Sequence, residues 1–188
     1  MMRPQVERIV TAAILGVFGT SGIGIEDAKH SPITFRRALA DDDIDALIRG
    51  SQERHGMYVR CESVTAAGGS NCGELRLLMT YGAHYYHFSG HQEKAEQSAF
   101  DVLFATVHVV GQEKAKPNGA AGSGGHFGIT GSSNVHYIYD VFPEPIGEMR
   151  VRALDSVDAD GAGENQNIVK GEYRFGIGFR LDISGGVD

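Results

Sequence analysis

The sequence predicts one α+β domain, in which an antiparallel or mixed β-sheet carries two long amphipathic helices packed on one face. Apolar residues recur at helical spacing over Val6–Val17 and again over Ala95–Val110. Elsewhere apolar and polar residues alternate as in half-buried strands, most regularly over Tyr173–Ile183. An order of helix, hairpin, helix and terminal strands favours a sheet with helices on one side. A chain of 188 residues fits a single core.

The first helix is predicted from its apolar spacing and its ends. Pro4 suits a first helical turn, and Gly16 and Gly19 indicate the end. The apolar run Ile9–Phe18 also invites comparison with a secretory signal, but no small-x-small cleavage site follows it. The run is also too short to span a bilayer, so we expect a helix of the domain.

Residues 19–56 are predicted to form an irregular insertion that contains a short helix. A short strand is expected at Ile33–Phe35, and Asp41 can cap a helix that ends at Gly50. The run Asp41-Asp42-Asp43 could instead bind a cation. A helix N-terminus also favours carboxylates, so capping is the interpretation that we adopt.

Two strands and a turn predict a β-hairpin in the middle of the chain. The strands are Met57–Val64 and Glu74–Phe88, and Gly68–Asn71 is the turn. Near the C-terminus, Asn134–Phe142 alternates clearly, and a weaker strand is expected over Met149–Ala153.

Three segments are predicted to lie between these elements. A turn is expected at Pro143–Pro145 and an acidic loop at Asp155–Asn167. Residues 111–133 are rich in glycine, alanine and serine, which predicts a flexible Gly-rich loop or arm.

Composition limits the classes of function. The net charge of −7 argues against a protein that grips nucleic-acid phosphates, because such a surface needs clustered lysine and arginine. Cys61 and Cys72 are too few for a disulfide scaffold and form no Cys-x-x-Cys pair, so a reduced compartment is expected.

His84, His87 and His91 are the strongest metal candidates in the sequence. Three nearby imidazoles could hold zinc or another divalent ion, which would suit a small metal-dependent enzyme. On a strand, however, His84 and His87 point to opposite faces, and His91 follows the break at Gly90. We therefore expect strand-end histidines without a metal, and keep the three residues as weak candidates.

Other catalytic motifs are weaker still. The segment Gly19–Gly24 is similar to a dinucleotide phosphate loop, but a helix rather than a strand precedes it. Cys61 could be a nucleophile, although a single cysteine on a strand is more often packed in a core. The sequence predicts no catalytic residues, no cofactor and no enzyme.

The succession of elements resembles the tail terminator, or tail completion, proteins of long-tailed bacteriophages. The pattern consists of the Val6–Val17 helix, the hairpin of Met57–Val64 and Glu74–Phe88, the Ala95–Val110 helix and the Tyr173–Ile183 strand. The resemblance covers about two thirds of the chain and leaves out the insertion and the Gly-rich loop. It lies in the order of elements and not in a sequence motif.

The resemblance implies a structural virion protein without chemistry. Such subunits form a hexameric ring that caps the tail tube at its head-proximal end and joins it to neck or connector proteins. DNA would pass through the ring without sequence-specific binding, the acidic charge would agree with such a channel, and no membrane is involved. The loop at 111–133 would be an arm that grips the tube or a neighbour. The alternatives are another head–tail connector or a tail tube subunit, and the metal-dependent enzyme considered above.

Overall fold

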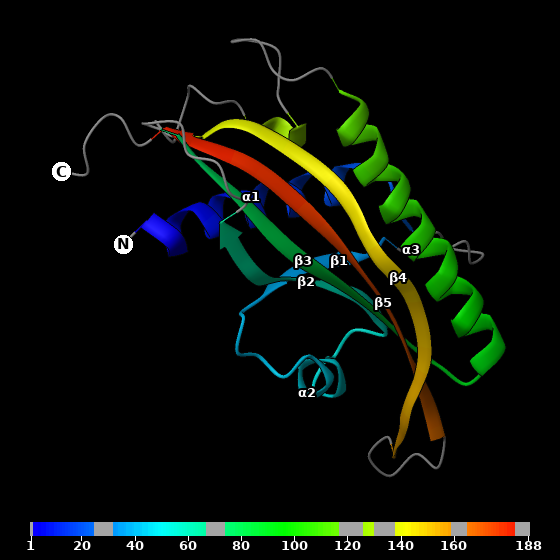
Figure 1. Ribbon diagram of the computed structural model, residues 1–188. Coiled ribbons are helices and arrows are strands. Elements are labelled where there is room, and N and C mark those ends of the chain that lie inside the picture. The colour runs from blue at the N-terminus through cyan, green and yellow to red at the C-terminus, as the bar shows by residue number, and fades with distance from the viewer. Residues whose placement is uncertain are drawn as a thin grey trace.

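The computed structural model describes residues 2–24, 32–66, 74–116, 126–129, 138–158 and 165–182 (Figure 1). Its helices are α1 (Met2–Thr20), α2 (Ile44–Arg49) and α3 (Gln92–Ala115), with a short 3-10 helix η1 (His126–Gly128). Its strands are β1 (Thr34–Ala38), β2 (His55–Ala66), β3 (Glu74–Ser89), β4 (Ile138–Asp158) and β5 (Asn165–Asp182). No helix in these ranges is long and apolar enough to cross a membrane.

The strands form one five-stranded mixed sheet, so the predicted α+β class is confirmed. The strand order is β1-β2-β3-β5-β4, in which β1 is parallel to β2 and every other neighbouring pair is antiparallel. The hairpin of β2 and β3 therefore lies beside β5, which places β3 at the centre of the sheet. Both edges are open in the described chain, with β1 at one side and β4 at the other.

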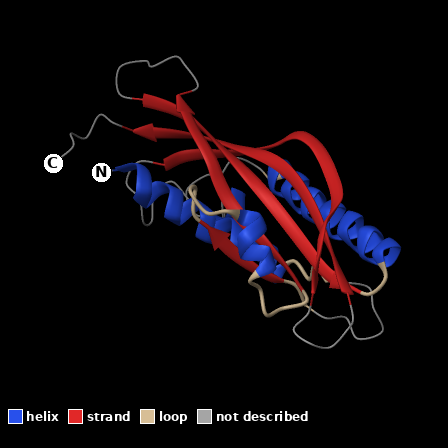
Figure 2. Cartoon of the chain, turned by 90° about the horizontal axis from the view of Figure 1, so that it is seen from below, coloured by secondary structure: helices blue, strands red, loops and turns tan. Residues whose placement is uncertain are grey.

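Helices α1 and α3 share one hydrophobic core with the same face of the sheet (Figures 1 and 2). Alternation along the strands supplies this face, because every second side chain points to the same side. The core also contains stacked aromatic rings, Tyr81 on Phe175 and Tyr173 on Phe175, with centroids 5.6 and 5.7 Å apart. The largest fully buried side chains of this face are those of Phe18, Ile14, Met57, Met79, Tyr81, Tyr85, Leu103 and Phe175.

Helix α3 lies very close to β5 at one glycine. A Cβ atom built on Gly171 would lie 2.8 Å from Leu103 Cδ1 and 3.4 Å from Ala99 Cβ. A side chain at this position would force the helix and the strand apart, since cores are packed without spare volume. The absence of a side chain at Gly171 therefore sets the distance between α3 and the sheet.

Among the described residues, the opposite face of the sheet is covered at one end by the short helix α2. Ile44 and Ile48 are buried there against Tyr58, Tyr86 and residues of β4 and β5. The helix cap is Asp43, whose carboxylate accepts hydrogen bonds from the backbone N–H groups of Asp45 and Ala46. The prediction that Asp41 caps this helix was therefore wrong by two residues.

Strand β4 is longer than predicted and has no turn at Pro143–Pro145. The chain stays extended from Ile138 to Asp158 and pairs with β5, with irregularities on either side of the prolines. Both prolines are tolerated because β4 is an edge strand, where a missing N–H can face away from the ladder. The prediction of a turn between two strands was wrong, since the sequence does not reveal that this strand is at an edge.

The segment predicted as a Gly-rich loop is partly helical. Helix α3 continues through Gly111 to Ala115, and its buried Glu113 accepts a hydrogen bond from the backbone N–H of Phe127 in η1. His126 is also buried and contacts the Glu113 carbonyl oxygen. The end of α3 and η1 are thus joined, while residues 117–125 and 130–137 lie outside the described chain.

Candidate functional site

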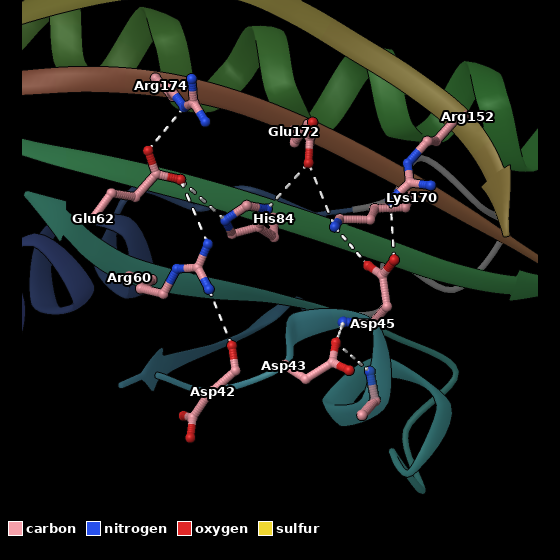
Figure 3. A network of polar contacts seen from close by, with 11 residues as sticks. Asp42, Asp43, Asp45, Arg60, Glu62, His84, Arg152, Lys170, Glu172 and Arg174 are labelled. Atoms are coloured by element: carbon pink, nitrogen blue, oxygen red, sulfur yellow. Dashed lines mark hydrogen bonds and ion pairs between the residues drawn. The ribbon is translucent and has the colours of Figure 1, made fainter. Parts of the chain in front are cut away.

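The polar side chains of the sheet gather on the face that α1 and α3 leave open (Figure 3). They occupy alternate positions of the strands, opposite in phase to the core residues. Strand β2 contributes Arg60 and Glu62, β3 contributes His84, β4 contributes Glu148, Arg150 and Arg152, and β5 contributes Lys170, Glu172 and Arg174. We call these nine residues, together with Asp45 of α2, the open-face network.

His84 lies at the centre of the open-face network. Its side chain is 7% exposed and lies between two carboxylates, with Nε2 3.9 Å from Glu62 and Nδ1 3.4 Å from Glu172. Neither ring nitrogen makes a hydrogen bond to the described residues. Both separations exceed the length of a good hydrogen bond, so attraction to a protonated ring would be mainly electrostatic.

Glu172 is the most strongly perturbed acid of the network. Its interaction with His84 lowers the pKa of the Glu172 carboxyl from 4.5 to about 2, opposed by partial burial and aided by Lys170. The Lys170 ammonium is 3.4 Å from the Glu172 carboxylate and is itself buried. This carboxylate is therefore held in its charged form.

Asp45 connects α2 to strands β4 and β5. Its carboxylate accepts hydrogen bonds from Lys170 Nζ at 2.7 Å and from Arg152 at 3.0 Å. Partial burial raises the pKa of Asp45, but the two cations outweigh burial and lower the pKa overall. A buried lysine without such partners would be costly, and Asp45 with Glu172 supplies them.

Glu62 joins the other end of the network. It forms an ion pair with Arg174, whose Nε is 2.8 Å from the carboxylate, and lies 3.7 Å from the Arg60 guanidinium. Arg60 in turn donates to the Asp42 carbonyl oxygen at 3.0 Å, in the turn before α2. The network thus links β2, β3, β5, β4 and α2 through alternating positive and negative groups (Figure 3).

An open hollow of about 320 Å³ lies over the network. Its lining is mostly charged and of mixed sign, comprising Glu62, His84, Glu148, Arg150, Glu172, Tyr173 and Arg174. The Arg174 and Arg150 side chains are each held by a carboxylate, Glu62 and Glu148 respectively. The hollow therefore offers few free charges of either sign to a ligand.

The three histidines singled out in the sequence are not brought together. His84 lies on the open face, whereas the His87 ring contacts Tyr85 and His55, and His91 is exposed before the first turn of α3. Alternation along β3 separates the first two, as predicted from the strand period. In the described ranges, no group of three or more metal-binding side chains could hold an ion.

The remaining candidate motifs take part in local structure. The first residues of the Gly19–Gly24 segment end α1, with Gly22 at a φ of +71°. Cys61 is buried in the main core, where its Sγ lies 3.7 Å from the Ser63 carbonyl oxygen. Asp42 accepts a hydrogen bond from the Leu39 N–H, and Asp43 caps α2, so two of the three consecutive aspartates bind backbone groups.

The residues that surround His84 in the open-face network were not predicted from the sequence. Glu62, Lys170 and Glu172 are ordinary polar members of alternating strands in the sequence, and Asp45 belongs to a short helix far from them. The alternation in the sequence shows that these strand residues lie on the polar face of each strand, but it does not show the strand order that brings β2, β3 and β5 together. The only available signal was that three strands carry charged residues in the phase opposite to the core.

Comparison of the sequence with models of known protein families finds no match, and comparison with curated proteins finds none either. The candidate function therefore depends on the arrangement of the chain itself.

Proposed function

We propose that this chain is a structural virion protein, similar to a bacteriophage tail terminator, that forms a ring at the head-proximal end of the tail. The observation that carries the proposal is the arrangement of elements: β3 and β5 lie side by side within one sheet, and the two long helices α1 and α3 pack on the same face. In this role the subunit caps the tail tube and joins it to neck proteins.

The two open sheet edges support a cyclic assembly. Strands β1 and β4 lie at opposite ends of the strand order, so the two sides of a subunit are different surfaces. Different surfaces that meet head to tail generate a closed ring when the rotation between subunits closes. A hexamer is the ring that the resemblance to tail terminators implies.

The chemistry of the open face is compatible with a channel that lets DNA pass. Lys170, Arg174 and Arg60 are held by carboxylates of the same network. Cations that are already paired give phosphate less to bind than clustered free cations do. A surface of this kind, in a chain with a net charge of −7, would contact DNA without retaining it.

The test is the mass of the purified full-length chain by light scattering, with negative-stain images of the same sample. The proposal predicts particles of six subunits with a central hole, alone or after addition of tail tubes. Long tubes formed by the chain alone would contradict capping and indicate a tail tube subunit. A chain that stays monomeric with tail tubes and fails to bind their ends would overturn the ring.

Metal analysis of the same sample tests the enzymatic alternative. Because His84, His87 and His91 lie apart, we expect no stoichiometric zinc or iron. Bound metal that is lost in His87→Ala, and kept in the matched variant His108→Ala on the exposed face of α3, would overturn the structural role.

A further inference from the structure

Helix α3 presents two exposed aromatic side chains on the surface that faces away from the sheet. Phe100 is 39% exposed and Phe104 61% exposed, and their rings stack with centroids 6.5 Å apart. They are two of the three large apolar residues that are exposed in the described chain; the third is Leu39 after β1. Paired exposed aromatics on one helix are typical of an interaction surface.

The two phenylalanines belong to a regular seam along α3. Glu93, Gln97, Phe100, Phe104, Val107 and Gly111 follow one another at alternating spacings of four and three residues. Val107 is half-buried and the other five are exposed. Such alternation places all six on one stripe of the helix and is the spacing of a two-helix contact.

The seam is symmetric about its own centre. Phe100 and Phe104 flank the midpoint of the seam, and Glu93 and Gly111 lie at equal distances from it. If a second α3 packs antiparallel across a two-fold axis at this midpoint, Phe100 faces Phe104 of the other copy and Glu93 faces Gly111. A Cβ atom at Gly111 would have no neighbour within 4 Å in the monomer, so this glycine leaves room for the facing helix.

Charge along α3 selects the antiparallel orientation. The first half carries Glu93, Glu96 and Asp101 against one cation, Lys94. The second half exposes Lys114 and His108, while its acid Glu113 is buried and paired with Lys116. An antiparallel pair places acidic halves beside basic halves, whereas a parallel pair would place like charges together.

We propose that the α3 surface is a docking site for a second copy of this chain, which binds through its own α3 to form a two-fold antiparallel helix pair. The contact is isologous, because each copy contributes the same seam. It uses the outer surface of α3 and leaves the sheet edges available, so it neither requires nor excludes the proposed ring. A contact of one helix pair is small, which favours a dimer that forms at micromolar concentration.

Sedimentation velocity of the full-length chain over a concentration series tests the contact. The expected species is a dimer, or a pair of rings with twelve subunits if the chain forms hexamers. Phe104→Glu should weaken the two-fold contact about 100-fold or more, because it places a carboxylate against Phe100 of the other copy. Leu39→Glu is the matched control, because it changes an exposed apolar residue elsewhere and should leave the contact intact. Single rings or monomers of the natural chain up to about 100 µM, or an unchanged mass for Phe104→Glu, would overturn the proposal. Single rings would leave the proposed function standing.

Disulfide trapping tests the orientation. In a Cys72→Ser background, Glu93→Cys combined with Gly111→Cys should give covalent dimers on mild oxidation, since the two positions face each other across the axis. Neither single variant should be trapped, because each cysteine would face a residue without a thiol. Dimers from Glu93→Cys alone would indicate a parallel pair, and no dimers from the double variant would exclude the antiparallel contact.

Discussion

At the scale of single residues, the open-face network shows how a buried histidine and a buried lysine are accommodated on a sheet. His84 and Lys170 are both buried, and Glu172 lies between them. Burial of the Lys170 ammonium is unfavourable without opposite charge nearby, and the Glu172 carboxylate supplies that charge. The low pKa of the Glu172 carboxyl is the measurable consequence.

Glu172→Gln should therefore lower the free energy of unfolding, with a pH dependence that identifies the cause. The Glu172 pKa falls from 4.5 in the unfolded chain to about 2 in the folded protein, so its contribution is present above pH 4.5 and disappears as the pH falls towards 2. Because the side chain is 31% exposed, solvent screening limits the expected loss at pH 7 to about 1–2 kcal/mol. Urea unfolding of both proteins at pH 7 and near pH 3 measures the difference, which should shrink at the lower pH.

The matched control for Glu172→Gln is Glu148→Gln. Glu148 belongs to the same face but is 79% exposed and pairs with the exposed Arg150. Its removal should change the free energy of unfolding by less than about 0.5 kcal/mol. Equal effects of the two variants would contradict a special role for Glu172.

At the scale of elements, the short helix α2 depends on its N-cap and on the contacts beneath it. It has only six residues, which is too few for an isolated helix in water. The Asp43 cap and the burial of Ile44 and Ile48 hold it on the sheet, and Asp45 joins it to Lys170. The cap follows from local geometry, whereas its position two residues after Asp41 depends on how the chain leaves β1.

Asp43→Ala should destabilise the protein by about 1 kcal/mol, because two backbone N–H groups at the start of α2 lose their acceptor. Asp41→Ala removes an equal charge from an exposed residue outside the cap and should have little effect. Chemical denaturation of the two variants separates capping from net charge. A larger loss for Asp41→Ala would show that the cap has been assigned to the wrong aspartate.

At the scale of the whole molecule, the two faces of the sheet have different roles. One face, with α1 and α3, contains most of the apolar core, and the other carries paired charges beyond α2. The net charge of −7 belongs to the whole chain and does not describe the open face, where cations and carboxylates alternate. The expected interaction with DNA therefore depends on pairing as well as on total charge.

The chain should bind duplex DNA with a Kd above about 100 µM at physiological salt, which is a lower affinity than that of ordinary non-specific binders. Fluorescence anisotropy of a labelled duplex measures this affinity. Glu148→Lys, which adds a cation and releases Arg150, should bind more strongly and lose that affinity as salt is raised. Tight, salt-sensitive binding by the natural chain would contradict passive passage of DNA.

The sequence by itself determined the elements whose pattern is local. The α+β class and the strands near Met57–Val64, Glu74–Phe88 and Tyr173–Ile183 follow from periods that neighbouring residues define. The opposite orientations of His84 and His87 follow from the same strand period.

Only the tertiary structure decided the strand order, the edge position of β4 and the partners of His84. These features depend on contacts between residues that are far apart in the chain, such as Lys170 with Asp45 and Arg174 with Glu62. Pro143 and Pro145 predict a turn locally, yet an open edge permits them in a strand. A local pattern fixes which side chains share a face, whereas long-range packing decides which faces and strands meet.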